Sequence, residues 1–240
     1  MNKLLSILLC SILISACNQN RYDVIIRNAL VVDGSGAVGY QADVGINADT
    51  IAIIGDLSKA VSTHVIDASG LVLAPGFIDT HSHHDRGMFD NADMIALTSQ
   101  GVTTMIVGQD GGSHVPLSNF LNQLDSMPVA INVGSYTGHN SLRRIVLGEK
   151  YQRQSTQEEV DQMIALLKKD LETGSLGLST GLEYDPGIYS NKEEVVELAK
   201  TLVPYKGRYI SHMRSEDRYF WKALQEIINI GKQTGVPVQI

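Results

Sequence analysis

The chain has 240 residues, of which 43% are hydrophobic and 19% charged, and its formal net charge at pH 7 is −7. This composition is that of a globular protein, and the length allows one large domain with a small appendage. Because nucleic-acid binding needs lysines and arginines clustered on one face, and this acidic sequence has no such cluster, we expect no nucleic-acid partner.

Residues 1–17 have the pattern of an export signal. Lys3 supplies positive charge, an apolar run covers residues 4–14, and small residues follow. The run is too short to cross a bilayer as a helix. It ends in the segment LISAC at residues 13–17, which resembles a bacterial lipobox and implies lipidation of Cys17. An ordinary secretory signal cut after Ala16 is the alternative.

The leader also predicts a location. Asn18, and not an acidic residue, follows the cysteine, and the resemblance to sorting in Gram-negative bacteria implies an exported, periplasmic protein held at the outer membrane by its lipid. The two cysteines, Cys10 and Cys17, both lie in this leader. Metal ligands after residue 17 must therefore be His, Asp or Glu, and no disulfide is available there.

Two regions follow the leader. Residues 22–73 consist of short alternating apolar runs separated by Gly and Asp turns, which predicts a small β-rich module, interpreted as a β-sandwich. Residues 74–240 alternate strand-like and helical runs, and the strand-like runs begin at residues 77, 103, 129, 177, 208 and 236. This α/β pattern favours a (β/α)₈ TIM-like barrel over an open sheet.

The barrel is expected to be incomplete. A barrel of this kind needs about 250 residues for itself, and fewer follow Pro75. The chain also stops inside an apolar, strand-like run. We therefore expect a fragment that is truncated after about six strands.

Capping signals predict where helices begin. Ser155 or Thr156 is followed three residues later by Glu158 or Glu159, which is a capping box, and Gly174 ends the apolar helical pattern that follows. A second helix is expected from Ser190 and a third over residues 219–231. The third is expected to bury Trp221, Leu224, Ile227 and Ile228.

The first barrel strand leads into a group of imidazoles. The segment GFIDTHSHHD at residues 76–85 places His81 and His83 two residues apart, and such residues point to the same face of a strand. Imidazole suits Zn, Fe, Ni or Cu, and Asp79 and Asp85 can orient a ring or join the coordination sphere. A polar turn is the alternative, but three histidines and two aspartates within seven residues favour a metal site.

Polar residues recur where the other strands are expected to end, as they do in barrel enzymes. Asp110 beside glycines is either a turn residue or an oxygen ligand, and His212 is either a ligand or a buried core histidine. Glu183 and Tyr184 can equally form a salt bridge and a core phenol. Arg143 can bind a substrate carboxylate in bidentate fashion, with a solvated arginine as the alternative.

Six segments carry a resemblance to a known family: DVIIRNA at 23–29, VDG at 32–34, APGFIDTHSH at 74–83, QGVTT at 100–104, GLSTGL at 177–182 and SHMR at 211–214. They resemble the amidohydrolase superfamily and, within it, the D-aminoacylase or N-acyl-D-amino-acid deacylase group. The resemblance covers residues 22–240.

The resemblance implies one or two divalent metal ions, with Zn²⁺ expected, and the candidate ligands are His81, His83, Asp110, Glu183 and His212. Asp110 stands where this family usually has a cysteine, and Glu183 is the candidate bridging carboxylate. Tyr184 matches a tyrosine that helps to hold the substrate carboxylate.

The implied activity is metal-dependent hydrolysis of the amide bond in small N-acyl-D-amino acids, which releases a carboxylate and a D-amino acid. A further metal histidine and the general acid/base aspartate are expected beyond Ile240, so the fragment itself should be inactive. The alternatives are a dipeptidase, a cyclic-amide hydrolase of the dihydroorotase or hydantoinase type, and a lipoprotein that binds metal without turnover.

Overall fold

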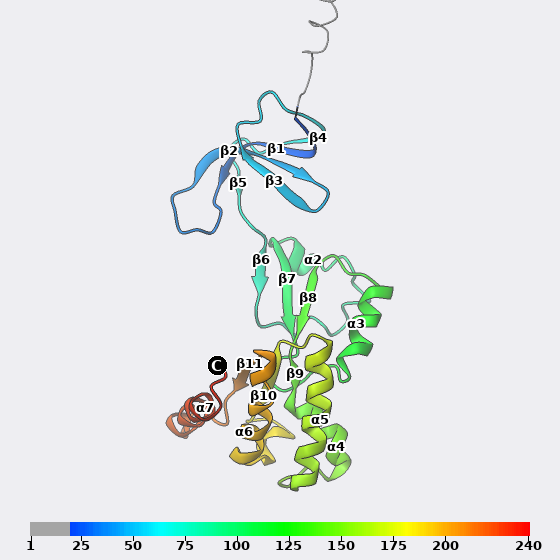
Figure 1. Ribbon diagram of the computed structural model, residues 1–240, viewed down its shortest axis with the longest axis vertical. Coiled ribbons are helices and arrows are strands. Elements are labelled where there is room, and N and C mark those ends of the chain that lie inside the picture. The colour runs from blue at the N-terminus through cyan, green and yellow to red at the C-terminus, as the bar shows by residue number, and fades with distance from the viewer. Residues whose placement is uncertain (1–19) are drawn as a thin grey trace, which may run out of the picture. The chain divides into compact units, whose positions relative to one another are not determined.

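A computed structural model describes residues 20–240, which divide into two compact units with the boundary between Pro75 and Gly76 (Figure 1). The predicted leader with Cys17 lies outside the described residues. Over residues 20–240, no helix has the length and apolar character needed to cross a membrane.

The first unit is built on one five-stranded sheet. Its strands are β1 (Arg21–Val31), β2 (Tyr40–Asn47), β3 (Thr50–Gly55), β4 (Val61–Asp67) and β5 (Val72–Leu73). They are ordered β3-β2-β1-β4, and β5 also pairs with β1. The β1–β2 and β2–β3 pairs are antiparallel, whereas β4 and β5 run parallel to β1. A sandwich needs a second, facing sheet, and the described residues of this unit form only this one.

The core of the first unit is small. Ala29, Val31, Val44 and Ala68 are buried together. Several other apolar side chains stay exposed, among them Ile51, Ile53, Val65 and Val72. The sheet therefore buries one set of side chains and presents a second apolar set to solvent.

The second unit contains the predicted series of parallel strands. Its strands are β6 (Phe77–Asp79), β7 (Val102–Val107), β8 (Asn132–Ser135), β9 (Thr137–Gly138), β10 (Gly177–Gly181), β11 (Arg208–His212) and β12 (Val238–Gln239). They form the sheets β6-β7-β8 and β9-β10-β11-β12, in which every pair is parallel. Only Tyr136 separates β8 from β9, so neighbouring strands follow chain order through both sheets.

The series is open within the described chain. Over residues 76–240, β6 pairs only with β7 and β12 only with β11, so these two strands do not close a barrel. The α/β class and the chain-order arrangement of strands agree with the sequence prediction, whereas the closed barrel is not formed by these residues.

Helices connect the strands and pack beside one another. They are α2 (Ile95–Thr98), α3 (Leu117–Ser126), α4 (His139–Leu147), α5 (Gln157–Thr173), α6 (Lys192–Lys200) and α7 (Phe220–Thr234), with short 3₁₀ turns η1 (Gly148–Lys150), η2 (Gly187–Tyr189) and η3 (Val203–Tyr205). Helices α4 to α7 contact each other in chain order. Between them and β10 and β11 lies the main core, which includes Leu142, Met163, Leu167, Leu178, Leu198 and Tyr209.

The predicted capping box forms at α5. The Thr156 hydroxyl accepts the Glu159 backbone N–H at 3.3 Å, and the Glu159 carboxylate accepts the Thr156 N–H at 2.8 Å. Gly174 ends the helix in the left-handed region, with φ 114°. Helix α6 begins one residue later than predicted, because its N-cap is Asn191, whose side chain accepts the Glu194 N–H, and not Ser190.

The predicted buried face of α7 is wrong in part. Trp221 is 77% exposed and Ile228 37% exposed, whereas Ile227 is buried as predicted. The buried positions include Glu226, whose carboxylate accepts hydrogen bonds from the Arg214 guanidinium at 3.0 and 3.1 Å. Because Glu226 is buried by this ion pair, the buried face of α7 consists of Ala223, Glu226, Ile227 and Ile230, and Trp221 lies outside it.

The corrected face predicts a contrast between two α7 variants. Ile227→Ala should lower the free energy of unfolding by about 2–5 kcal/mol, because it opens a cavity in a core position. Trp221→Ala should change it by no more than about 0.5 kcal/mol, because that indole is exposed. Urea denaturation followed by circular dichroism measures both, and equal losses would contradict this helix orientation.

Candidate metal centre

His81 and His83 lie in the loop that follows β6. The strand ends at Asp79, so strand alternation is not what aligns the two rings, contrary to the sequence argument. A turn aligns them: the Asp79 carboxylate accepts the His81 backbone N–H at 3.2 Å, and the Ser82 N–H donates to the Ile106 carbonyl at 2.9 Å. The two imidazole centroids are 5.5 Å apart.

Asp110 meets both rings. Its Oδ2 atom lies 3.4 Å from His81 Nε2 and 3.0 Å from His83 Nε2. Strands β6 and β7 are parallel neighbours, so the loops that follow them leave the same edge of the sheet. Ligand atoms of the three residues all lie within 4.8 Å of one another.

The loop that carries Asp110 needs its glycines. Asp110 has φ 53°, and Gly108 and Gly111 have φ 75° and 78°. A Cβ atom at Gly108 would collide with the Tyr136 carbonyl, and one at Gly111 would collide with the Asn140 side chain. The turn and ligand interpretations of Asp110 are therefore compatible, because the turn is what aims the carboxylate.

The donor set fits a divalent cation. Two imidazole nitrogens and one carboxylate oxygen suit Zn²⁺ and neighbouring first-row metals, and three protein ligands are typical of catalytic zinc sites that keep one position for a reactant. Asp85 does not contact these rings and instead accepts a hydrogen bond from His114 Nε2 at 3.1 Å. Burial raises the pKa of Asp85, but this hydrogen bond and the charge of His114 outweigh it and leave the pKa lowered.

His212 belongs to a second, neighbouring cluster. It ends β11, and its Nε2 lies 3.2 Å from Glu183 Oε2 and 3.6 Å from Glu216 Oε1. The Tyr184 hydroxyl lies 2.6 Å from His212 Nδ1. Of the predicted ligands, the structure thus brings His81, His83 and Asp110 into one group and His212 and Glu183 into another. Within residues 20–240, the group whose ligand atoms lie within 4.8 Å of one another does not include His212.

Tyr184 connects the two clusters. It lines a pocket of about 460 Å³, together with His83, Asp110 and Asn140. Burial raises the pKa of Tyr184, and the negative charge of Asp110 raises it further, so the phenol stays protonated at neutral pH. The pocket therefore holds imidazole, carboxylate and a phenolic donor side by side.

The prediction for Arg143 is wrong. Its side chain is fully buried, and Nη1 lies 2.7 Å from both carboxylate oxygens of Glu194 on α6. His139 Nε2 donates to the same carboxylate at 2.7 Å. Arg143 is therefore neither a substrate ligand nor a solvated arginine, and the three residues form what we call the buried triad. Successive residues point about 100° apart on a helix, so the next residue, Arg144, lines the pocket instead.

In the buried triad, His139 is neutral and Glu194 is negatively charged. Burial lowers the pKa of His139 despite its hydrogen bond to Glu194, and within residues 20–240 the Nδ1 atom has no hydrogen-bond partner. Burial raises the pKa of Glu194, but the hydrogen bonds from His139 and Arg143 outweigh it and lower the pKa to about 2. At neutral pH the triad holds a neutral imidazole and an ion pair.

Acid should therefore destabilise this unit. Neutral His139 contributes stability above its ordinary pKa of 6.5, and this is lost as pH falls below 6.5; Glu194 contributes above 4.5, and this is lost as pH falls from 4.5 towards 2. We expect the free energy of unfolding to fall between pH 4.5 and pH 2.5 more steeply in the native chain than in Glu194→Gln. Urea titrations at pH 4.5, 3.5 and 2.5 measure the slopes, and parallel slopes would contradict this assignment.

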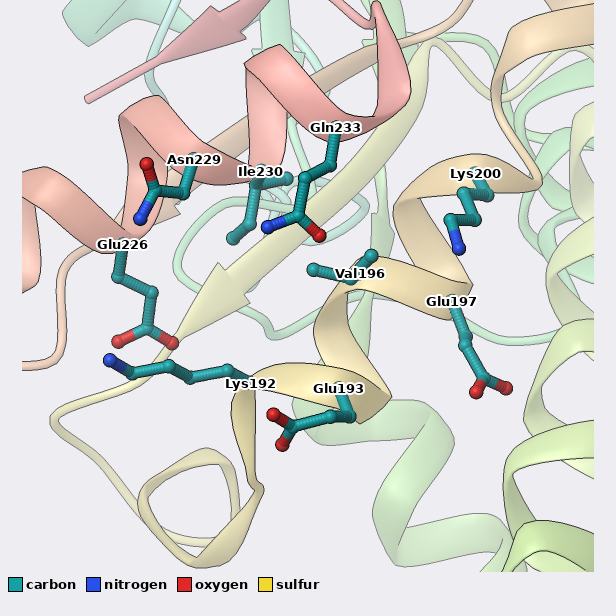
Figure 2. A pocket seen from close by; sticks show the side chains of 9 residues that line it. All are labelled: Lys192, Glu193, Val196, Glu197, Lys200, Glu226, Asn229, Ile230 and Gln233. Carbon is teal, nitrogen blue, oxygen red and sulfur yellow. The ribbon is translucent and has the colours of Figure 1, made fainter.

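A second hollow lies between α6 and α7 (Figure 2). Its volume is about 280 Å³, and its charged lining residues are Lys192, Glu193, Glu197, Lys200 and Glu226. Glu226 is already paired with Arg214. This hollow holds none of the predicted site residues, so the pocket beside Asp110 is the candidate site.

The geometry defines an α/β protein with candidate metal ligands in the loops that follow parallel strands. Residues 64–240 match the amidohydrolase family. The chain is 35% identical to the D-aminoacylase of Alcaligenes xylosoxydans, over 94% of this chain and 51% of that protein. It is 33% identical to the N-acyl-D-glutamate deacylase of the same organism, over 90% of this chain and 49% of that protein. The chain therefore belongs to the amidohydrolase family.

Solved structures of deacylases have the same fold as this chain. A D-aminoacylase crystal structure superposes with a TM-score of 0.84 at 35% identity, over 90% of this chain and 50% of that one. An N-acyl-D-glutamate deacylase from Bordetella bronchiseptica, complexed with zinc and a phosphonate inhibitor, gives 0.87 at 32% identity, over 92% and 51%. An L-hydantoinase from Arthrobacter aurescens shares the fold at 17% identity and a TM-score of 0.65. This chain spans about half the length of the relatives it matches.

Proposed function

We propose that the complete protein hydrolyses the amide bond of N-acyl-D-amino acids, with a divalent metal ion, Zn²⁺ first, held by His81, His83 and Asp110. The convergence of three ligand atoms within 4.8 Å beside the pocket carries this proposal. The D-aminoacylase and deacylase relatives support the substrate class, and the zinc complex of the Bordetella deacylase supports the metal.

An ion held there would supply Lewis acidity, which polarises a carbonyl and lowers the pKa of bound water to about 7. Addition of water to the amide carbonyl, cleavage of the C–N bond and protonation of the departing nitrogen give a carboxylate and an amino acid. We assign the proton transfer to the general acid/base aspartate that the family resemblance places outside this chain.

The second cluster positions the substrate in this proposal. Because the Tyr184 phenol stays protonated, its hydroxyl can donate a hydrogen bond to the substrate carboxylate from the pocket wall. His212 and Glu183 lie 3.2 Å apart and can hold a second ion, with Glu183 as the bridging carboxylate.

We further propose that the complete protein closes the parallel strands into a (β/α)₈ barrel and covers the first sheet as a sandwich. Both end strands have an unpaired edge, and apolar side chains there are exposed: Phe77 62%, Ile78 61% and Ile240 57%. Exposed apolar residues on the first sheet, such as Ile51 at 62%, support the second statement.

Substrate profiling of the complete, zinc-loaded protein tests the activity. We expect release of free amino acid from N-acetyl-D-amino acids, with little from the L enantiomers, from dipeptides or from hydantoins. Preferential cleavage of dipeptides or cyclic amides would assign a different amidohydrolase activity. Metal binding without turnover of any of these substrates would contradict the proposed activity and favour the alternative of a metal-binding lipoprotein without catalysis.

We also propose a lipid anchor at Cys17 and a periplasmic location at the outer membrane. The segment LISAC at residues 13–17, followed by Asn18, supports this. Radioactive palmitate should label the native protein and not Cys17→Ala, which should leave the membrane fraction. An unlabelled native protein would contradict the anchor.

A further inference from the structure

Two arginines line the candidate pocket without an anionic partner. Arg86 lies in the loop after β6, and Arg144 lies on α4; both line the pocket that also contains His83, Asp110 and Tyr184. In the part of the chain that the structure describes, neither guanidinium lies within 4 Å of a carboxylate. Two other exposed arginines of this unit, Arg153 and Arg218, have such partners in Glu159 and Asp217.

Arg144 is held in place and still has donors to offer. Its guanidinium carbon lies over the Tyr151 ring, 4.9 Å from the ring centroid, which is a cation–π contact. Among residues 20–240, its guanidinium makes one hydrogen bond, a long one from Nη2 to the Asp185 carbonyl at 3.5 Å. Guanidinium has five N–H donors in a planar fork, so an edge remains for a carboxylate.

The carboxylates around the pocket are engaged with other residues. Asp110 is engaged with His81 and His83, and Asp185 accepts from the Tyr151 hydroxyl at 3.4 Å. Glu183 and Glu216 of the neighbouring cluster lie beside His212. The donors of Arg86 and Arg144 are therefore available for a carboxylate other than the one that Tyr184 can bind.

We propose that Arg86 and Arg144 form a specificity subsite for a second carboxylate, carried by the side chain or by the acyl group of the substrate. This inference rests on the proposed amide hydrolysis, and it adds the substrate class: dicarboxylic N-acyl amino acids. The subsite acts mainly on KM, because it binds a part of the substrate away from the bond that breaks.

Kinetics of the complete, zinc-loaded protein on matched substrates test the subsite. N-acetyl-D-glutamate is compared with N-acetyl-D-glutamine for a side-chain charge, and N-succinyl-D-alanine with its terminal amide for an acyl charge. We expect a charged substrate to have a higher kcat/KM than its neutral match in at least one pair, and the responsive pair identifies which part of the substrate reaches the arginines. No preference in either pair would overturn the proposal and leave the proposed activity intact.

Variants assign the preference to the two arginines. Arg144→Gln and Arg86→Gln should each lower kcat/KM for the favoured charged substrate by about 10- to 100-fold, mostly through KM, the loss expected for a charged hydrogen bond. The neutral match should change by less than about 2-fold, and Arg21→Gln on β1 is the control. Equal losses on charged and neutral substrates would overturn the proposal, because they indicate a structural role.

A binding measurement separates this proposal from the proposed function. Calorimetric titration of the zinc-loaded complete protein with glutarate needs no turnover, and Arg144→Gln should weaken glutarate binding at least about 10-fold. If no N-acyl amino acid is hydrolysed but glutarate binding depends on Arg144, the activity proposal fails and the anion subsite stands. Glutarate binding that is absent, or unchanged in Arg144→Gln, overturns the subsite.

Discussion

Glu194→Ala is expected to lower the free energy of unfolding by about 3–5 kcal/mol, because it leaves the Arg143 guanidinium buried without a counterion. Arg143 is fully buried and Glu194 is 3% exposed, so neither solvent nor a rotamer change can compensate. Urea denaturation at pH 7 measures the loss. The neighbouring Glu193 on the same helix is exposed, and Glu193→Ala is the control, with an expected change within about 0.5 kcal/mol.

A double variant separates the ion pair from simple loss of packing. Arg143→Met with Glu194→Met removes both charges and retains volume, so it should recover a large part of the stability lost in Glu194→Ala. A loss of 1 kcal/mol or less in Glu194→Ala would contradict the buried triad. A double variant that is less stable than Glu194→Ala would show that the charges themselves stabilise the fold.

Asp110→Ala is expected to weaken Zn²⁺ binding by at least about 100-fold, since even the loss of a residue that only supports a metal ligand costs 10- to 100-fold. The carboxylate is the point where both imidazoles converge, at 3.4 and 3.0 Å. Calorimetric zinc titration measures the affinity.

Two further variants are controls for this loss. Asp110→Asn keeps a residue type that tolerates the φ of 53° at this position, but removes the charge, so it should also bind weakly. Asp125→Ala on α3 removes an exposed carboxylate away from the loop and should bind as the native chain does. Native affinity in both Asp110 variants would contradict the assignment of Asp110 as a ligand.

Local sequence signals predicted the elements well. The capping box at Thr156 and the glycine stop at Gly174 depend on contacts within a few residues. The parallel strands were predicted from short apolar runs between helical patterns, and they pair in chain order. Closure of the barrel and formation of a second sheet in the first unit depend on strand partners far apart in the sequence. Short local patterns do not specify such partners.

The incorrect predictions for Trp221 and Arg143 both concern places where a charged side chain is buried. Apolar periodicity placed Trp221 inside, because it could not show that Glu226 is buried by its pair with Arg214. The same limit applies to Arg143, since its partner Glu194 lies 51 residues away in the sequence. A guanidinium that looks free in a sequence can therefore be committed to a distant carboxylate.

Residue type and spacing predict the histidine pair, and the structure gives a different local reason for its geometry. His81 and His83 converge through a turn after Asp79 and not through a strand. Arg86 and Arg144 were not selected from the sequence, because each is one residue away from a stronger candidate and only helix rotation and loop path place them at the pocket.

Anomalous diffraction from zinc-soaked crystals is the most direct test of the metal centre. The structure predicts a peak bound by His81 Nε2, His83 Nε2 and an Asp110 carboxylate oxygen, at about 2.0–2.2 Å from each. A peak at another group, such as the His114 and Asp85 pair, with none beside Asp110, would contradict the account.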